Sequence, residues 1–278
     1  FSGADNLNAN LPVMVWFHGG GNTAGHGGPL IFEGSNLASR GAVVVTANYR
    51  LGAFGFLAHP ALTSESEQSS SGMYGILDQV EVLRWVQNNI ADFGGDPSRV
   101  TIFGQSAGGT DVCLIMSSPL SEGLVHGVIG QSPGCIKTSN TLAEQGHERG
   151  ENFARALGIV GTGDSALEAM RELPPQQIIS AMSTAGSGGG PLIDGYVIPD
   201  RPYNQLQSGQ QNRIPVLVGG LADEYFGLQQ LSPEITEEQL DSYLQSAFGE
   251  AATEVKAAYN DIVKESPLDA RKVITGDD

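Results

Sequence analysis

The chain has 278 residues, of which 40% are hydrophobic, enough to bury a sizeable core in one large α/β domain or two smaller ones. Its 31 acidic residues outnumber the 14 basic ones, and a net charge of −17 argues against nucleic acid and anionic membranes as partners. No stretch is long and apolar enough to suggest a membrane span. An acidic, lysine-poor surface fits secretion or a salty environment, and composition does not choose between them.

The first motif is a glycine loop that follows an apolar run. Residues 11–17 (LPVMVWF) predict a buried strand, which leads into His18-Gly-Gly-Gly-Asn22. Glycine lets backbone N–H groups approach a ligand closely, and no Gly-Lys-Ser/Thr follows that would indicate a P-loop. The loop matches the HGGG loop that supplies oxyanion-hole donors in esterases and lipases, the alternative being a flexible surface loop. We interpret His18 as an anchor of this loop rather than a catalytic base.

The next elements alternate between helix and strand. The spacing of Ile76, Val80, Leu83, Val86 and Ile90 gives one apolar stripe. This stripe predicts an amphipathic helix over about 74–93, ended by Gly94-Gly-Asp-Pro97. Three further elements are predicted before it: a short helix over 32–39, a strand over 42–46 and an exposed Ser/Glu-rich loop over 62–72.

The central motif is a G-x-S-x-G between a strand and a helix. The β-branched run over 100–103 predicts a short buried strand, and Val112 and Leu114 indicate a helix beyond it. Between them lies Gly104-Gln-Ser-Ala-Gly108. Glycines flank a turn too tight for side chains, so Ser106 stands at its apex and is predicted to be a nucleophile. The alternative is an ordinary glycine-rich turn with Ser106 as a helix N-cap.

The rest of the chain continues the alternation. Thr236 and Gln239 form a plausible capping box at the start of a helix. The other predicted elements are a strand over 128–132, helices over 141–157 and 165–171, a flexible segment over 186–190, a strand over 214–219 and a helix over 251–263. Strands alternating with helices predict a mostly parallel sheet covered on both faces, in a single domain over 1–278.

Five blocks in one order carry a resemblance to a known family. They are HGGGN at 18–22, NYRLGAFGFL at 48–57, GILDQVEVLRWVQNNIADFGGDPSRVTIFGQSAGG at 75–109, IDGYVIPD at 193–200 and PVLVGGLADE at 215–224. Together they resemble the type-B carboxylesterases, the cholinesterase-like branch of the α/β-hydrolases. The resemblance implies an α/β-hydrolase fold, and we expect this chain to be a fragment that is incomplete at both ends of that fold.

The resemblance also implies site residues. Ser106 would be the nucleophile, and the N–H groups of Gly20, Gly21 and Ala107 would form the oxyanion hole. Glu224 would be the acid of the triad.

Two departures from the family pattern lie close to these positions. Asp223 is a rival for the acid, because Tyr225 stands where the family usually has glycine after the glutamate. Gln105 replaces the acidic residue common before the serine in the cholinesterase branch. This replacement argues against a cationic, choline-type substrate.

The base of the triad is the difficulty. In this fold the histidine follows the acid in the chain, but all five histidines precede Glu224: His18, His26, His59, His126 and His147. We place His26, His59 and His147 in loops or facing solvent and expect none of the five to be the base. The triad histidine is then missing from this chain.

The predicted function is a serine carboxylesterase acting on a small-molecule ester through an acyl-enzyme on Ser106, with no metal or other cofactor. Two alternatives stay open: a non-catalytic, cholinesterase-like binding or adhesion domain, and an inactive fragment of the esterase. The two cysteines, Cys113 and Cys135, lack metal-ligand spacing, and we expect two free thiols.

Overall fold

The computed structural model describes residues 1–136, 138–186, 189–221 and 235–277, without the side chains of 275–277. The chain forms two compact units, Phe1–Val218 and Gly219–Asp278. No helix in these described ranges is long and apolar enough to cross a membrane.

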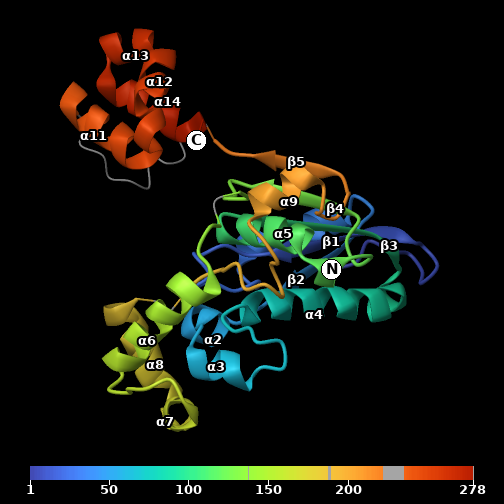
Figure 1. Cartoon of the computed structure of the whole chain (residues 1–278). Helices are drawn as coiled ribbons and strands as arrows, with labels where there is room; N and C mark the ends of the chain where they lie inside the picture. The colour runs from blue at the N-terminus through green and yellow to red at the C-terminus, as the bar shows by residue number, and fades with distance from the viewer. Residues whose placement is uncertain (137, 187–188, 222–234, 278) are drawn as a thin grey trace. The chain divides into compact units, whose positions relative to one another are not determined.

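A five-stranded sheet is the centre of the first unit (Figure 1). Its strands are β1 (Leu11–Phe17), β2 (Val43–Ala47), β3 (Gly95–Gln105), β4 (Gly127–Gln131) and β5 (Val216–Gly219). They lie in the order β2-β1-β3-β4-β5, and β1 pairs in parallel with both β2 and β3, as β3 does with β4. The predicted parallel sheet is therefore present, and the carboxyl ends of β1 and β3 meet at one edge of it.

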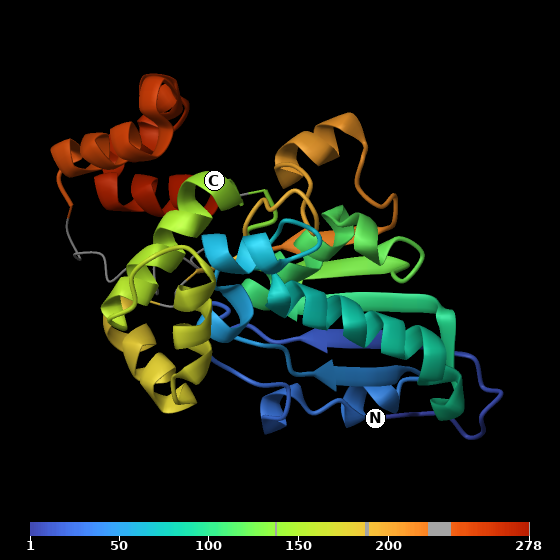
Figure 2. The same cartoon turned by 60° about the horizontal axis from the view of Figure 1, so that its bottom comes forward.

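Alternate residues of β1 face two different layers. Val13, Val15 and Phe17 are fully buried in the main core, which also contains the apolar stripe of α4 (Tyr74–Asn89) and residues of α5 (Ala107–Ser117). On the other face, Met14 packs beside the short helix α1 (Ser35–Ala38). Figure 2 shows α4 lying along one face of the sheet. Successive side chains of a strand point to opposite faces of the sheet, and in β1 both sets are apolar. Both faces therefore need a cover, and helices provide it.

The long helix α4 follows its predicted bounds. It continues as the 3₁₀ turn η2 (Ile90–Phe93) and ends at Gly94, whose φ of +77° favours glycine.

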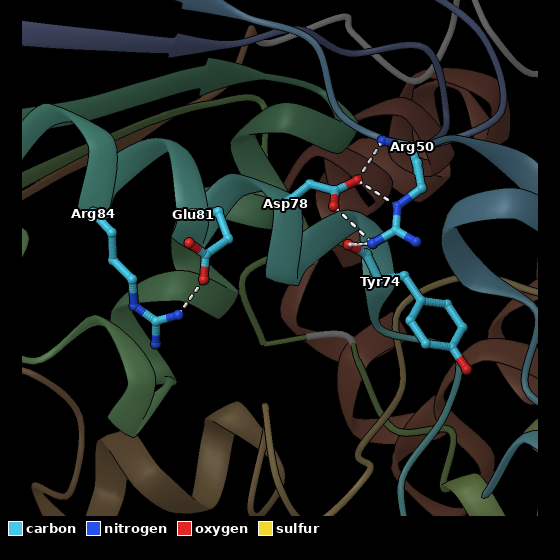
Figure 3. Close-up of polar contacts among 5 residues, drawn as sticks. All are labelled: Arg50, Tyr74, Asp78, Glu81 and Arg84. Carbon is cyan, nitrogen blue, oxygen red and sulfur yellow. Dashed lines mark hydrogen bonds and ion pairs between the residues drawn. The ribbon is translucent and has the colours of Figure 1, made fainter. Parts of the chain in front are cut away.

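Arg50 fixes the start of α4 (Figure 3). Its Nε and Nη2 donate to the two oxygens of Asp78 at 2.8 and 2.7 Å, and its guanidinium lies 5.4 Å from the ring centre of Tyr74. One turn further along α4, Arg84 pairs with Glu81.

A group of helices packs outside the sheet layers. Its members are α2 (Gly52–Phe56), α3 (Pro60–Glu65), the π-helical turn η4 (Leu142–Gly146), α6 (His147–Ala156), α7 (Asp164–Glu172) and α8 (Pro175–Ala185). The exposed loop predicted over 62–72 is wrong: α3 occupies its beginning, and Ser70 and Ser71 are buried against other parts of the chain. Three short elements complete the unit: η1 (Leu30–Phe32), η3 (Pro119–Ser121) and α9 (Pro202–Ser208).

The second unit is a small helical cluster in its described part. It contains α11 (Glu237–Phe248), η5 (Gly249–Ala251), α12 (Ala252–Ala258), α13 (Asn260–Glu265) and α14 (Pro267–Asp277). The capping box is confirmed, since Gln239 N–H donates to Thr236 Oγ1 at 3.2 Å and Thr236 N–H to Gln239 Oε1 at 2.9 Å. Leu240 and Leu244 of α11 pack against Val263 and Ile274.

The prediction of free thiols is wrong. Cys113 on α5 and Cys135 in the loop after β4 form a disulfide, with their Cα atoms 5.2 Å apart. The loop folds back onto α5, where Gly134 N–H donates to Thr110 Oγ1 at 2.8 Å. This return of the chain cannot be seen in the spacing of the two cysteines.

Candidate active site

Ser106 occupies the sharp turn between β3 and α5. Its φ of 55° and ψ of −122° lie in a region that side chains rarely adopt, so the backbone is strained at Ser106. Ser106 is exposed, and within the described residues its hydroxyl has no hydrogen-bond partner. The N–H of Ser106 donates to the carbonyl of Gln131, at the end of β4, at 2.9 Å. The turn thus holds a free hydroxyl above the edge of the sheet.

The two motif glycines are required by close packing. A Cβ on Gly108 would lie 2.1 Å from the carbonyl oxygen of Phe17, and one on Gly104 would lie 2.4 Å from the backbone of Gly108. The first turn of α5 therefore packs directly against the end of β1. Because β1 runs into the glycine loop, this contact brings the loop and Ser106 together.

The glycine loop lies against the serine. A Cβ on Gly19 would be 3.2 Å from Ser106 Cβ and 2.6 Å from the carbonyl oxygen of Gln105. Gly20 has a φ of +113° and Gly21 a φ of +64°, both in the region that favours glycine. The carbonyl of Gly20 accepts the N–H groups of Thr23 and Ala24 at 3.1 and 3.2 Å, which turns the loop back on itself.

Three backbone donors, two in the glycine loop and one directly after Ser106 in the chain, have no acceptor among the described residues. In the described part of the chain, the N–H groups of Gly20, Gly21 and Ala107 donate to no protein acceptor. Ala107 is the first residue of α5, and the start of a helix favours negative charge. Free N–H groups beside a free hydroxyl are what stabilisation of an oxyanion requires.

A buried polar cluster, not predicted from the sequence, contacts the glycine loop. Asp111 on α5 is fully buried and accepts Asn22 Nδ2 at 2.9 Å and Gln79 Nε2 at 2.7 Å. Burial raises the pKa of Asp111 to about 7, partly offset by these hydrogen bonds. Tyr49 donates to the carbonyl of His18 at 2.6 Å and to Asn22 Oδ1 at 3.0 Å. The visible signal in the sequence is that Asp111 is the one charged residue in the stretch that forms α5.

Burial and the neighbouring Asp111 raise the pKa of Tyr49, so its hydroxyl remains a neutral donor.

His18 is buried and packs as an anchor of the loop. Its ring stacks on that of Tyr49 with the centres 4.6 Å apart, and its Nδ1 lies 2.8 Å from the carbonyl oxygen of Gly19.

The other four histidines have partners away from Ser106. His59, expected in a loop or facing solvent, is instead fully buried and caps α3 by accepting Ala61 N–H, and burial lowers its pKa. His147, expected in a similar setting, is half-buried at the start of α6, where Nε2 lies 2.8 Å from Thr63 Oγ1. His126 Nδ1 accepts Val100 N–H at 3.3 Å, and His26 is exposed. No histidine hydrogen-bonds Ser106 among the described contacts.

The predicted acid of the triad falls on a part of the chain that the structure leaves out. Glu224, its rival Asp223 and Tyr225 lie outside the described residues. The strand expected to lead to them is present as β5.

An apolar cavity of about 300 Å³ adjoins the helix that contacts the glycine loop. Gly52, the first residue of α2, donates its N–H to the carbonyl of Asn22 at 2.7 Å, and the next residue, Ala53, lines the cavity. Most of the remaining lining is aliphatic or aromatic, including Phe153 and Met170, with Arg171 among the lining residues.

The parallel sheet, the helices on both faces and the serine at a strand–helix turn define an α/β-hydrolase fold. The family model described as "Carboxylesterase family" matches residues 2–272, and the chain belongs to this family.

Named relatives and solved structures to which the chain is similar are also esterases. A fumonisin B1 esterase of Sphingopyxis macrogoltabida is 42% identical over 252 residues, which are 90% of this chain and 46% of that protein. A para-nitrobenzyl esterase of Bacillus subtilis (strain 168) is 34% identical and is matched over 90% of this chain and 51% of its own length. The solved structure of a Geobacillus stearothermophilus carboxylesterase superposes with a TM-score of 0.79 at 32% identity, covering 95% of this chain and 59% of that one. The chain thus spans about half the length of the curated relatives it matches.

Proposed function

We propose that this chain carries the nucleophile and the oxyanion hole of a serine carboxylesterase that hydrolyses carboxylic esters through an acyl-enzyme on Ser106. One observation carries the proposal: the strained, exposed Ser106 lies against Gly19, in a loop whose next two N–H groups are free.

The reaction follows from the charge that develops on the ester. Ser106 Oγ attacks the carbonyl carbon and the π electrons move to the carbonyl oxygen, which becomes an oxyanion. The N–H groups of Gly20, Gly21 and Ala107 would donate to this oxygen, and one such donor is worth about 3 kcal/mol in the transition state. The base takes the proton of Ser106 Oγ during the attack; the oxyanion electrons then re-form the C=O bond, the ester C–O bond breaks, and the alcohol leaves with that proton. Water then gives a proton to the same base and attacks the acyl-enzyme, and collapse of the second oxyanion releases the carboxylic acid and returns the proton to Ser106 Oγ.

Proton transfer requires a base oriented by an acid. Glu224, five residues after β5 in the sequence, is the proposed acid, and a histidine other than the five in this chain is the proposed base. With none of the five bonded to Ser106, we expect residues 1–278 alone to hydrolyse esters slowly.

We further propose that the ester carries an aliphatic or aryl group and that the apolar cavity beside α2 receives it. Its lining offers few polar partners, and Ala53 connects it through Gly52 to the glycine loop.

Hydrolysis of p-nitrophenyl acetate by the protein as its gene encodes it tests the proposal. We expect turnover that falls by about 10⁴-fold or more in Ser106→Ala, since removal of the nucleophile leaves only the oxyanion hole and binding. A folded protein whose Ser106→Ala variant keeps its full rate would contradict it.

A further inference from the structure

We propose that Asp111 is a positioning residue, whose buried carboxyl group fixes the glycine loop and so holds the N–H groups of Gly20 and Gly21 beside Ser106. The inference rests on the proposed function, because it concerns the same oxyanion hole.

Asp111 joins the helix of the nucleophile to the loop. It lies on α5 five positions after Ser106 and is fully buried. One carboxyl oxygen accepts Asn22 Nδ2 from the loop at 2.9 Å, and the other accepts Gln79 Nε2 from α4 at 2.7 Å. Gln79 of α4 therefore helps to hold the Asp111 carboxyl group in place on α5, and this carboxyl group in turn holds the side chain of Asn22.

Asn22 passes this constraint to the loop. Its carbonyl accepts Gly52 N–H at 2.7 Å and its Oδ1 accepts the Tyr49 hydroxyl at 3.0 Å. The same hydroxyl donates to the carbonyl of His18 at 2.6 Å. The loop is thus fixed at both ends, His18 and Asn22, and the intervening glycines, which have no side chains to hold them, take their positions from these ends.

A carboxyl group suits this position because the side-chain amides of Asn22 and Gln79 both present donors to it. Without an acceptor, the amide groups of Asn22 and Gln79 would be buried and unpaired, a cost that moving the loop would relieve. Oxyanion donors act only when held within about 0.5 Å of their productive position. Loss of Asp111 would therefore misplace the donors even though they remain in the sequence.

The test measures kcat and KM for p-nitrophenyl acetate, with the urea midpoint of each variant, in the protein as its gene encodes it. In Asp111→Ala we expect kcat to fall about 30-fold or more with KM changed less than about threefold, because oxyanion donors act on the transition state. In Asp111→Asn we expect the rate to be largely rescued: Oδ1 still accepts from Asn22, and the unpartnered Oε1 of Gln79 can turn to accept from the new amide.

Two further variants separate positioning from simple loss of stability. Asn22→Gly suits the φ of +57° and removes the side chain that contacts Asp111, so we expect the same loss of kcat, with no further loss in the double variant. Asp194 is the matched control: it is also buried, and its carboxylate accepts the N–H groups of Val197 and Ile198 at 3.1 and 2.8 Å. Asp194→Ala should lower the urea midpoint comparably and leave kcat within about threefold.

The outcomes are distinguishable. If the wild type is active and dependent on Ser106, but Asp111→Ala and Asn22→Gly keep its kcat, this inference is wrong and the proposed function stands. If Asp111→Ala does not fold, Asn22→Gly with unchanged kcat overturns it equally. A wild type without Ser106-dependent hydrolysis overturns both.

Discussion

The N–H of Ser106 donates to the carbonyl of Gln131 at 2.9 Å. The loop that follows Gln131 therefore begins directly beside the proposed nucleophile, and it is tied to α5 a second time by the disulfide between Cys113 and Cys135. Helix, strand end and loop form one cross-linked block around Ser106.

Reduction of this disulfide should destabilise the chain. The two cysteines are 22 residues apart. In the chain-entropy model, a disulfide that closes a loop of this length restricts the unfolded chain, so breaking it lowers the free energy of unfolding by about 3 kcal/mol. Urea unfolding with and without dithiothreitol measures the difference. The Cys113→Ala/Cys135→Ala variant should not respond to the reductant, and an equal response in both proteins would show that the effect arises elsewhere.

Backbone strain at Ser106 predicts an unusual order of stabilities. Ser106→Gly should unfold with a free energy about 1 kcal/mol higher than Ser106→Ala, because only glycine adopts the observed φ and ψ without strain of about 1–3 kcal/mol. Ser180, exposed within α8, gives the control: there the glycine variant should be about 1 kcal/mol less stable than the alanine variant. The same order at both sites would contradict strain at Ser106.

A methyl group on Gly108 should be poorly tolerated. Its Cβ would lie 2.1 Å from the carbonyl oxygen of Phe17, so α5 and β1 would have to separate, at a cost of about 3 kcal/mol. Gly190→Ala is the matched control, since a Cβ there meets nothing within 4 Å in the described part of the chain. Equal urea midpoints for the two variants would mean that α5 and β1 do not pack as described.

Asp111 should make stability depend on pH. Its folded carboxyl group keeps a proton up to about pH 7, whereas an unfolded aspartate loses it near pH ~4. Between these values the folded state binds more protons, so the free energy of unfolding falls as the pH rises, by up to about 1.4 kcal/mol per pH unit. This stabilisation is complete below about pH 4 and lost above about pH 7.

Asp111→Asn isolates that contribution. The groups facing the carboxyl are Asn22, Gln79 and Tyr49, none of which carries a charge in this range. The difference between wild type and Asp111→Asn should therefore slope between about pH 4 and 7 and be flat above. Parallel curves for the two proteins would show that Asp111 ionises normally.

The elements around Ser106 could be predicted because their signals are local. β1 has the predicted bounds 11–17, since a strand buried on both faces reads as one apolar run. The capping box of α11 could be predicted for the same reason, because it depends only on the four residues from Thr236 to Gln239. The Ser/Glu-rich start of the segment 62–72 was predicted as a loop but contains the end of α3, because contacts with α7 and not composition decide its structure.

The buried cluster under the glycine loop could not be predicted in the same way. Asp111 contacts Asn22 and Gln79, which lie 89 and 32 residues away in the chain. One sequence does not show that three such residues meet. The disulfide could not be predicted for the same reason: its cysteines meet because the chain after β4 turns back onto α5, which their spacing in the sequence does not show.

Labelling of Ser106 by a fluorophosphonate tests the central claim most directly. The protein as its gene encodes it would be treated with the reagent, digested and examined by mass spectrometry, with Ser106→Ala as the control. The account predicts one adduct, on the peptide that contains Ser106, and none in the variant. A folded protein that remains unlabelled at Ser106 would contradict it.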